Sequence, residues 1–393
     1  MNDPDPQLRV GIIQLVLTDY RCPFFERFAA NTRFVVSLFA GQPIADEGVK
    51  TARQLSGINL CTTVNHYWQG PIGLVYWQAN IRRWLQDFDP DVLVVGGNPR
   101  IWSHWSAIMW MHGRRRPVLG WGLGELERTG PVWLQKVRRR AAQTLVRALD
   151  GMIAYSSKAK ADYVAAGVAA DQVVIAHNSV DDSAAKQYLA QLGADRGWMA
   201  AWRQRLGLAS QLPIVLFVGR LIPQKRLDLL VEACIPLLDR CQLLIVGDGP
   251  SKPALEYLAQ PCKERIRFAG YQVGMPLAKC FIAADLFVLP GAGGLAVHQA
   301  MGYGKAILVS FGDGTEADLV REGQNGSFFK LGDVADLRAK ITRCLDDPTM
   351  TQRMGEVSLA IIRSEINLDA MVASFTRAVN GAVPCTLKRK SPA

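Results

Sequence analysis

The chain has 393 residues, of which 49% are hydrophobic and 20% charged, and its formal net charge is +10. This length suits two domains of roughly two hundred residues each, and the composition excludes a largely disordered protein. The eight cysteines are scattered, with no C-x-x-C and no Cys/His cluster at metal spacing, which indicates a reduced, cytosolic protein without structural zinc.

The first apolar run, in MNDPDPQLRVGIIQLVL, follows no basic region and precedes no small-residue cleavage site, so we expect no secretory signal. The most apolar stretch, 280–311, is interrupted by Asp285, His298, Gln299 and Lys305. A membrane span needs about eighteen or more predominantly apolar residues, and none is expected.

Short β-branched runs alternate with helical patterns along the whole chain. The first half predicts strands at 8–15, 92–96, 117–121, 151–155 and 172–176, with helices near 23–38, 76–87, 101–112, 131–149 and 157–167. The second half predicts strands at 213–218, 242–247, 265–268, 285–289 and 306–309, with helices near 225–239, 251–259, 275–283, 294–302, 315–322, 334–346, 349–363 and 366–381. Such alternation favours parallel sheets covered by helices on both faces.

Two such runs predict an α/β protein with two doubly wound, Rossmann-like domains that face each other across a cleft. We expect an N-terminal domain over 1–182 and a C-terminal domain over 183–365. The polar, slightly basic stretch 181–211 is interpreted as the connection between them.

The predicted helix 131–149 concentrates positive charge in Lys136, Arg138, Arg139 and Arg140, with apolar residues interleaved at roughly helical spacing. Two interpretations stay open, a core-packing helix with a solvated basic face and a helix resting on anionic lipid headgroups. Nucleic acid is not an expected partner, because the basic residues do not interleave with aromatics on a recognisable module.

Glycine turns follow several predicted strands, at Gly96-Gly97, Gly219-Arg220, Gly247-Asp248-Gly249 and Gly291-Ala292-Gly293-Gly294. Ligands of open α/β sheets bind beyond the carboxyl ends of the strands, where these turns lie. In the last turn a strand is followed by glycines and by a helix that starts near Leu295. The free N–H groups at such a helix start favour an anion.

Arg220 and Lys225 lie five positions apart in VLFVGRLIPQKRLDLLVEA, between a strand and the next helix. A guanidinium that binds in two-pronged fashion and an ammonium that acts as a point charge together suit a diphosphate. Exposed arginines and lysines are ordinary, but these two combine with the turn at 291–294. The three elements predict one diphosphate site.

At this point the chain resembles family 4 glycosyltransferases of the GT-B fold, and in particular bacterial surface-polysaccharide glycosyltransferases. The motifs that carry the resemblance follow one another in the family's order. They are VVIAHNSVD (173–181), FVGRLIPQKRLDLLVEA, LLIVGDGP (243–250), RFAGY (267–271), AADLFVLPG (283–291), QAMGYGKAIL (299–308) and EADLVREGQNG (316–326).

The resemblance implies sugar transfer from a nucleoside-diphosphate sugar with retention of configuration, with the donor mainly on the C-terminal domain and the acceptor mainly on the N-terminal one. It implies that Arg220 and Lys225 neutralise the leaving diphosphate, that Tyr271 lies near the nucleobase, and that Glu316 faces the donor. It also implies that the last helix, within 366–393, returns to the first domain. The donor-binding set is then Gly219, Arg220, Lys225, Gly247, Tyr271, Gly291, Gly293, Gly294, Leu295, Gln299 and Glu316.

The chain departs from the family pattern at three places. Gly291 and Gln299 stand where relatives commonly carry two glutamates, and Leu123 stands where some relatives carry a histidine. Gln299 can still hydrogen-bond a ribose hydroxyl through its amide. Glu125 and Glu127 are the nearest ionisable candidates for the acceptor hydroxyl or the sugar, although an exposed acidic loop before a helix is the favoured interpretation of both.

Retaining transfer does not require a strong protein base if the diphosphate's own oxygen accepts the acceptor's proton. With no D-x-D near these elements, we expect no metal and no other cofactor. Asp19 either faces the cleft or caps a helix, and His298 either reaches the donor or packs, with packing favoured. The other histidines, His104 among them, have no partner at ligand spacing and are expected to be structural.

A cytosolic enzyme of this kind fits assembly of a lipid-linked surface polysaccharide at the inner face of the plasma membrane, where it would act on a glycan or lipid-linked acceptor. Two alternatives remain. One is a catalytically weak or inactive GT-B scaffold, compatible with the loss of a glutamate at Gly291. The other is an enzyme like the nucleotide-sugar 2-epimerases, whose chemistry would want more carboxylates around the sugar.

Overall fold

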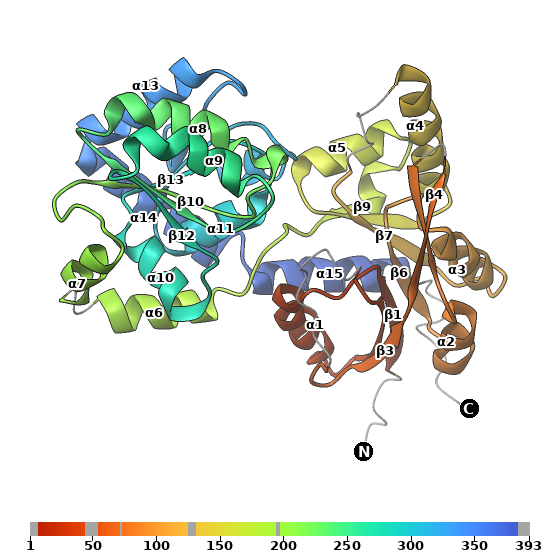
Figure 1. Ribbon diagram of the computed structural model, residues 1–393. Helices are drawn as coiled ribbons and strands as arrows, with labels where there is room; N and C mark the ends of the chain where they lie inside the picture. The colour runs from red at the N-terminus through yellow and green to blue at the C-terminus, as the bar shows by residue number, and fades with distance from the viewer. Residues whose placement is uncertain (1–6, 44–53, 71–72, 125–130, 194–196, 384–393) are drawn as a thin grey trace. The chain divides into compact units, whose positions relative to one another are not determined.

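The structure is a computed structural model that describes residues 7–43, 54–70, 73–124, 131–193 and 197–383. The chain divides into two compact units (Figure 1). Domain 1 contains Met1–His177 together with Leu368–Ala393, and domain 2 contains Asn178–Asn367. The sequence-based boundaries were 182/183 and 365/366.

Domain 1 is built on a parallel sheet of seven strands in the order β3-β2-β1-β6-β7-β8-β9. The strands are β1 (Leu8–Gln14), β2 (Phe34–Gly41), β3 (Asn59–Thr63), β6 (Val92–Gly96), β7 (Val118–Gly122), β8 (Gly151–Ala154) and β9 (Val173–Ile175). The chain runs outward from β1 to β3 and then returns to β6. The topological switch point of this sheet therefore lies between β1 and β6.

Two separate apolar layers cover the two faces of this sheet. One layer holds α1 (Cys22–Ala29) and α15 (Leu368–Ala382), and the other holds α2 (Ile81–Phe88), α3 (Trp102–His112), α4 (Val132–Arg147) and α5 (Ser157–Ala165). The antiparallel hairpin β4 (Asn65–Gly70) and β5 (Gly73–Gln78) stands apart from the main sheet. The short 3-10 helices η1 (Asp19–Arg21) and η3 (Ala170–Gln172) complete the described elements of the domain.

The last helix, α15, belongs to the core of domain 1. Its Phe375 is fully buried, with ring centroids 5.1 Å from Phe24, 5.0 Å from Phe28 and 5.1 Å from Trp121. Aromatic contacts in this range of distances stabilise a core beyond the area they bury. The predicted return of the C-terminal helix to the first domain is confirmed.

Domain 2 has a parallel sheet of six strands in the order β12-β11-β10-β13-β14-β15. The strands are β10 (Ile214–Val218), β11 (Gln242–Val246), β12 (Ile266–Gly270), β13 (Leu286–Leu289), β14 (Ala306–Val309) and β15 (Gly326–Phe328). Here the switch point lies between β10 and β13. Both domains thus have the doubly wound, Rossmann-like architecture that the alternating pattern predicted.

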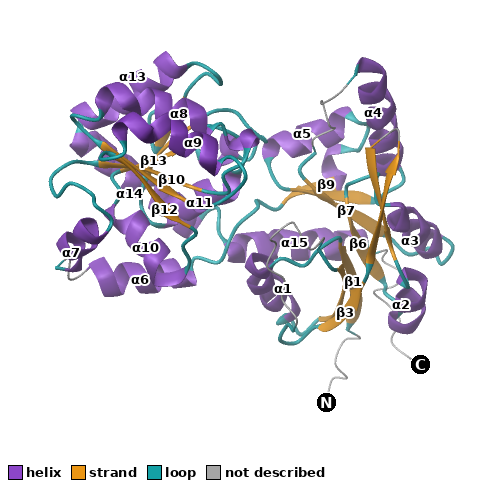
Figure 2. Ribbon diagram, viewed as in Figure 1, coloured by secondary structure: helices purple, strands orange, loops and turns teal. Residues whose placement is uncertain are grey.

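The helices of domain 2 lie on both faces of its sheet (Figure 2). They are α6 (Ser183–Gly193), α7 (Trp198–Arg205), α8 (Leu227–Cys234), α9 (Lys252–Ala259), α10 (Gly274–Ala283), α11 (Gly294–Gly302), α12 (Glu316–Leu319), α13 (Val334–Asp346) and α14 (Pro348–Ser364), with the 3-10 helices η4 (Pro223–Lys225), η5 (Ile235–Leu237) and η6 (Gln260–Cys262). The core between them includes the fully buried Phe217, Phe281 and Phe287.

Several predicted elements are wrong. The helix expected at 23–38 ends at Ala29, because the following segment FVVSLFAG is strand β2. The helix expected at 76–87 starts only at Ile81, after strand β5. The helix expected at 315–322 is the short α12, and the one expected at 225–239 is η4, α8 and η5 in succession.

The stretch 181–211 is also not a simple connection. It forms α6 and α7, and their Ala185, Leu192 and Trp202 are buried in the core of domain 2. Ala185, Tyr188, Leu189 and Leu192 recur along α6 with helical spacing toward that core, a pattern that the polar residues around them conceal.

Candidate functional site

The glycine turns of domain 2 lie at the switch point of its sheet. β10 and β13 are neighbours, with Val215 opposite Leu286 and Leu216 opposite Phe287. Gly219 and Arg220 follow β10, and the turn 291–294 follows β13, so both turns emerge at the same edge. That edge is the place where open α/β sheets bind their ligands.

The turn after β13 fits against η4 so closely that only glycine is tolerated. A Cβ atom on Gly291 would lie 2.1 Å from the carbonyl oxygen of Gln224. Gly293 has φ +133°, which side chains rarely adopt, and a Cβ there would lie 2.1 Å from Nζ of Lys225. The sequence-predicted Lys225, Gly291 and Gly293 are therefore in direct contact.

Gly247 makes a similar approach from the neighbouring strand, since its Cβ would lie 1.9 Å from the carbonyl oxygen of Gly219. Its φ of +136° is again one that favours glycine. Next to it, the N–H of Leu221 donates to the carbonyl oxygen of Asp248 at 2.9 Å. The backbone that carries Arg220 is thus fixed between the turns that follow β10 and β11.

Lys225 is half-buried, and its ammonium donates a hydrogen bond to the carbonyl oxygen of Ala292. Burial lowers the pKa of Lys225, the carboxylates of Asp313 and Glu316 oppose this, and the nearby Arg220 lowers it further. Arg220 itself is exposed. Two cations close enough to repel each other at a helix start form a site that an anion stabilises.

Glu316 is fully buried and holds the glycine turn. Its carboxylate accepts hydrogen bonds from the N–H groups of Gly314 at 2.9 Å, Asp313 at 3.3 Å and Gly293 at 3.4 Å. Burial raises the pKa of Glu316, with a further contribution from the charge of Asp313. The carboxylate is thus engaged with the backbone around α12 and the turn.

Leu295 is half-buried in the first turn of α11, directly after the glycines. The first N–H groups of an α-helix have no partner within the helix. They supply donors to an anion that lies against the turn.

Two predicted donor residues lie farther from this group. Tyr271 follows β12, two strands away from β10, and is 58% exposed. Gln299, on α11, lines a small pocket of about 110 Å³ together with Asp182, just before α6, and Tyr188 of α6.

His298 packs inside domain 2, as favoured from the sequence. It is 1% exposed, and its Nε2 lies 2.9 Å from the carbonyl oxygen of Ile366. Burial lowers its pKa to about 4. A neutral, buried ring bonded to the backbone is a structural histidine.

Only some of the predicted site residues of domain 1 lie within the described residues. Glu125 and Glu127 lie outside the described residues. Leu123 is half-buried and lines a cavity of about 630 Å³ at the ends of β1, β6 and β7. Asp19 is exposed in η1, where its carboxylate accepts from the N–H of Tyr20.

The sequence did not signal that His104 and Trp121 line this cavity. Neither has a partner at a fixed spacing in the chain, so no motif signals them. His104 is on α3, which packs on one face of the sheet, whereas the Trp121 ring packs with Phe24 and Phe375 in the layer on the other face.

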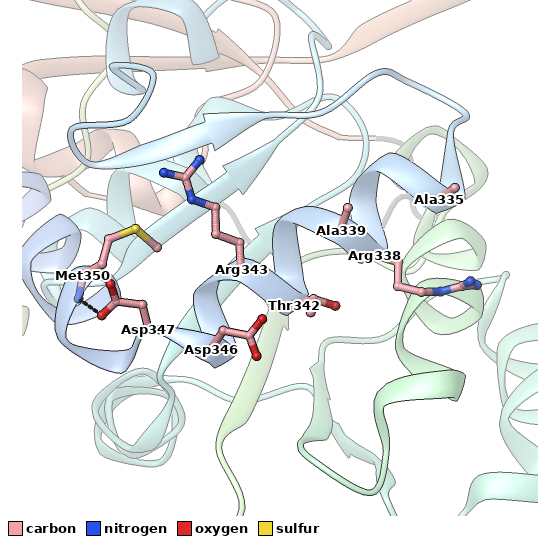
Figure 3. A pocket seen from close by; sticks show the side chains of 8 residues that line it. All are labelled: Ala335, Arg338, Ala339, Thr342, Arg343, Asp346, Asp347 and Met350. Atoms are coloured by element: carbon pink, nitrogen blue, oxygen red, sulfur yellow. Dashed lines mark hydrogen bonds between the residues drawn. The ribbon is translucent and has the colours of Figure 1, made fainter.

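A third hollow, of about 560 Å³, runs along the outer side of α13 (Figure 3). Figure 3 shows Arg338, Thr342 and Asp346 along the helix, and a hydrogen bond between Asp347 and the N–H of Met350 at the start of α14. Asp346 is paired with Arg240. These side chains come from two consecutive helices, and the hollow does not involve the glycine turns.

Within the described ranges, no group of three or more His, Cys, Asp or Glu side chains is arranged to hold a metal ion. The expectation that no metal is needed stays a prediction. In the same part of the chain no helix is long and apolar enough to cross a membrane.

Comparison with protein families gives a match of residues 212–347 to glycosyl transferases group 1. Curated proteins similar to the chain include the alpha-D-kanosaminyltransferase of Streptomyces kanamyceticus, 30% identical over 44% of this chain and 46% of that protein. The D-inositol 3-phosphate glycosyltransferase of Nocardia farcinica is 35% identical over 40% and 38%. The lipopolysaccharide core biosynthesis glycosyltransferase LpsE of Rhizobium meliloti is 26% identical over 45% and 52%. The chain spans about half the length of the curated relatives it matches.

Similar solved structures cover almost the whole chain. Anabaena HepE in complex with UDP aligns with a TM-score of 0.72 and 18% identity, covering 95% of this chain and all of that one. WaaG, a glycosyltransferase involved in lipopolysaccharide biosynthesis, aligns with a TM-score of 0.66 and 14% identity over 95% of this chain and all of that one. At these identities the likeness shows the fold, and the fold is GT-B.

Proposed function

We propose, from the membership of residues 212–347 in the glycosyl transferases group 1 family and from the GT-B fold of the chain, that this protein is a glycosyltransferase. Its donor is a nucleoside-diphosphate sugar held by domain 2. The observation that carries the proposal is the contact of Lys225 with the turn 291–294, at the edge where Arg220 also emerges. That HepE was solved with UDP and with UDP-glucose supports the choice of donor class.

The leaving diphosphate is stabilised by backbone and by cations. The N–H groups at the start of α11 face the anion, and no Cβ on Gly291 or Gly293 keeps it away. The guanidinium of Arg220 binds two phosphate oxygens, and the ammonium of Lys225 supplies a point charge. These groups stabilise the charge that develops on the diphosphate as the sugar leaves.

Transfer proceeds with retention of configuration. The bond from the anomeric carbon to the diphosphate oxygen breaks, and a bond from the acceptor hydroxyl oxygen forms on the same face. The proton of that hydroxyl passes to the diphosphate oxygen that has just been freed, so no protein base is needed. This suits a site in which Gly291 and Gln299 replace the carboxylates of relatives and Glu316 is bonded to the backbone.

The acceptor is a glycan or a lipid-linked glycan, and the setting is the assembly of a bacterial surface polysaccharide at the inner face of the plasma membrane. Support comes from relatives whose names place them in lipopolysaccharide core biosynthesis or describe a phosphatidylinositol monomannoside mannosyltransferase. Further support comes from α4, which exposes Trp133 together with Arg139 and Arg140. A helix of this kind suits an anionic bilayer surface.

The proposal is tested by turnover of radiolabelled UDP-, GDP- and dTDP-sugars on extracted lipid-linked oligosaccharide. Because hydrogen bonds to charged groups contribute about 1.5–3 kcal/mol, Arg220→Ala and Lys225→Ala should each weaken donor binding by about 10- to 100-fold and abolish most transfer. Arg353→Ala, an exposed arginine on α14, is the matched control and should leave both unchanged.

Unchanged turnover in both site variants would refute the assigned donor site. Binding of a donor without transfer from any member of the panel would instead favour the non-catalytic GT-B scaffold. An epimerase would convert the free nucleotide sugar in the absence of any acceptor.

A further inference from the structure

The loop 310–315, which joins β14 to α12, lies beside the donor site of domain 2. β14 pairs with β13 on the side away from β10, so Arg220, the turn 291–294 and this loop follow three consecutive strands of one sheet. Tyr271 follows β12, on the far side of β10. The loop is therefore the neighbour of the glycine turn on the side away from the residue that we expect near the base.

The backbone of this loop packs directly against the glycine turn. A Cβ atom on Gly312 would lie 2.5 Å from Cα of Ala292. One carboxylate oxygen of the buried Glu316, Oε1, accepts from the N–H of Gly293 at 3.4 Å and from the N–H of Asp313 at 3.3 Å. The backbone of Asp313 and the turn assigned to the diphosphate are thus bonded to the same atom.

The half-buried carboxylate of Asp313 is bound at one oxygen and free at the other. Oδ1 accepts from the N–H of Thr315 at 3.0 Å and from its hydroxyl group at 2.5 Å. Among the described residues, none donates a hydrogen bond to Oδ2 of Asp313 or forms an ion pair with it. The bonds to Thr315 are those of an ordinary turn aspartate, and they hold the side chain in one orientation while leaving Oδ2 for a ligand.

The charge of Asp313 acts within the donor site. Burial lowers the pKa of Lys225 and the carboxylate of Asp313 opposes this, whereas burial raises the pKa of Glu316 and Asp313 adds to it. An ionised carboxylate only accepts hydrogen bonds, as phosphate oxygens do. Asp313 therefore does not bind the diphosphate itself and needs a hydrogen-bond donor next to it.

We propose that Asp313 binds the sugar of the donor, with Oδ2 accepting hydrogen bonds from one or two of its hydroxyl groups. The inference rests on the proposed transferase function and adds a residue that selects among donor sugars. Because the base is expected near Tyr271, the sugar lies on the opposite side of the diphosphate, where the loop 310–315 stands. A sugar without the matching hydroxyl would leave this carboxylate desolvated and unpaired, which is the basis of strong discrimination.

Calorimetric titrations of the full chain in EDTA compare nucleotide sugars with their free nucleoside diphosphates. The panel is UDP-glucose, GDP-mannose and dTDP-glucose with UDP, GDP and dTDP, and the nucleotide sugar that the wild type binds most tightly is carried forward with its diphosphate. The measured quantity is the ratio of the two dissociation constants, nucleotide sugar over free diphosphate. A change in the charge of Lys225 acts on both ligands and therefore largely cancels in this ratio.

Asp313→Asn keeps the oxygen that Thr315 binds and places an uncharged amide at the position of Oδ2. It should raise the ratio by about 5- to 20-fold, because a hydrogen bond to a charged group is replaced by a weaker neutral one. The free diphosphate should bind as in the wild type or more tightly, since a negative charge beside its site is removed. An equal change for both ligands would overturn the inference, because Asp313 would then act only through the charge around Lys225.

Asp248 provides a matched control at the same sheet edge. It follows β11, it is exposed, and its Oδ1 accepts from the N–H of Gly249 at 2.8 Å. Asp248→Asn removes the same charge on the side of Arg220 away from β14, and it should leave the ratio unchanged. A rise as large as that in Asp313→Asn would contradict the inference, because the ratio would then respond to any nearby negative charge.

Nucleotide sugars that lack one sugar hydroxyl test the contact itself. Among the 2-, 3-, 4- and 6-deoxy forms of the chosen nucleotide sugar, at least one should bind the wild type at least about fivefold more weakly than the intact sugar, with a clearly smaller loss in Asp313→Asn. If every deoxy form loses the same affinity in both proteins, no sugar hydroxyl contacts Asp313 and the inference fails.

The donor-site proposal and this inference can fail separately. If the wild type binds no member of the panel, with or without its sugar, the proposed function is refuted and this inference with it. If Arg220→Ala weakens the free diphosphate while Asp313→Asn leaves the ratio unchanged, the donor site stands and only the role of Asp313 is refuted.

Discussion

At Lys225, burial and the nearby carboxylates shift the pKa of the amine in opposite directions. Burial and Arg220 lower the pKa of the amine, while Asp313 and Glu316 raise it, and the ammonium is bonded to the backbone of Ala292. The diphosphate of a donor would relieve the repulsion between the two cations. We therefore infer that Lys225 and Arg220 form a binding site for an anionic ligand.

Gly291 shows why a glutamate of the family pattern cannot simply be restored here. A Cβ at this position would meet the backbone of Gln224 at 2.1 Å and that of Lys225 at 2.8 and 2.9 Å. These are backbone atoms, which cannot rotate away as a flexible side chain would.

Gly291→Ala should therefore displace η4 from the turn and weaken UDP binding by at least about tenfold, with a loss of stability of about 1–3 kcal/mol for an overpacked site. Gly323→Ala is the comparison for stability, since it also changes a glycine of domain 2, with φ +73° but open space around its Cβ. Calorimetry of UDP binding and thermal melting measure both effects. Wild-type UDP affinity in Gly291→Ala would contradict the close packing described at this turn.

At the scale of the element, α4 uses its two sides differently. Leu134, Ala142, Leu145 and Val146 are buried against domain 1, whereas Val132 is 68%, Trp133 58% and Val137 43% exposed. Trp133 is exposed on the same helix as the exposed Arg139 and Arg140. We propose that this side of α4 contacts an anionic bilayer.

Vesicle sedimentation tests this role of α4. Each basic residue near an anionic bilayer contributes about 1 kcal/mol, so Arg139→Glu with Arg140→Glu should lower binding to vesicles containing phosphatidylglycerol by about 30-fold or more at low salt. Lys263→Glu with Arg353→Glu makes the same change at exposed positions of domain 2. Equal binding of both double variants would contradict the membrane contact.

The helices and strands also show which parts of the fold the sequence predicts. Apolar runs such as LRVGIIQ and IVLFV predict their buried strands, because a parallel strand covered on both faces is hydrophobic throughout. The short edge strands β3 and β15 and the hairpin β4–β5 were missed, since NLCTT, GSF and NHYWQG carry no such run. The helix predicted through 23–38 ran on into FVVSLFAG because α1 just before it is strongly amphipathic.

The two candidate sites also differ in how far the sequence predicts them. Arg220, Lys225 and the glycines lie in turns between strongly predicted strands and helices, so their placement at one sheet edge could be predicted from local patterns. The position of His104 could not be predicted in this way, because it depends on a contact with Gly96 and on a cavity wall formed by distant segments. Tertiary packing, which no short motif records, creates that cavity.

At the scale of the whole molecule, each domain has a switch point, the place where open α/β sheets bind ligands. Domain 2 presents glycine backbone and two cations at its switch point, which suit a diphosphate, and domain 1 has a cavity of about 630 Å³ at the ends of β1, β6 and β7. The transfer that we propose needs two substrates, and the residues at the two switch points differ. The same rule applies to both domains, namely that an open α/β sheet binds its ligand at the switch point of its strand order.

A crystal structure of the full chain with UDP would locate the donor site. We expect the diphosphate to lie against the first turn of α11, within hydrogen-bond distance of Arg220 and Lys225, whichever contacts the base makes. A diphosphate bound elsewhere, for example in the cavity of domain 1 or in the hollow along α13, with the turn 291–294 empty, would contradict it.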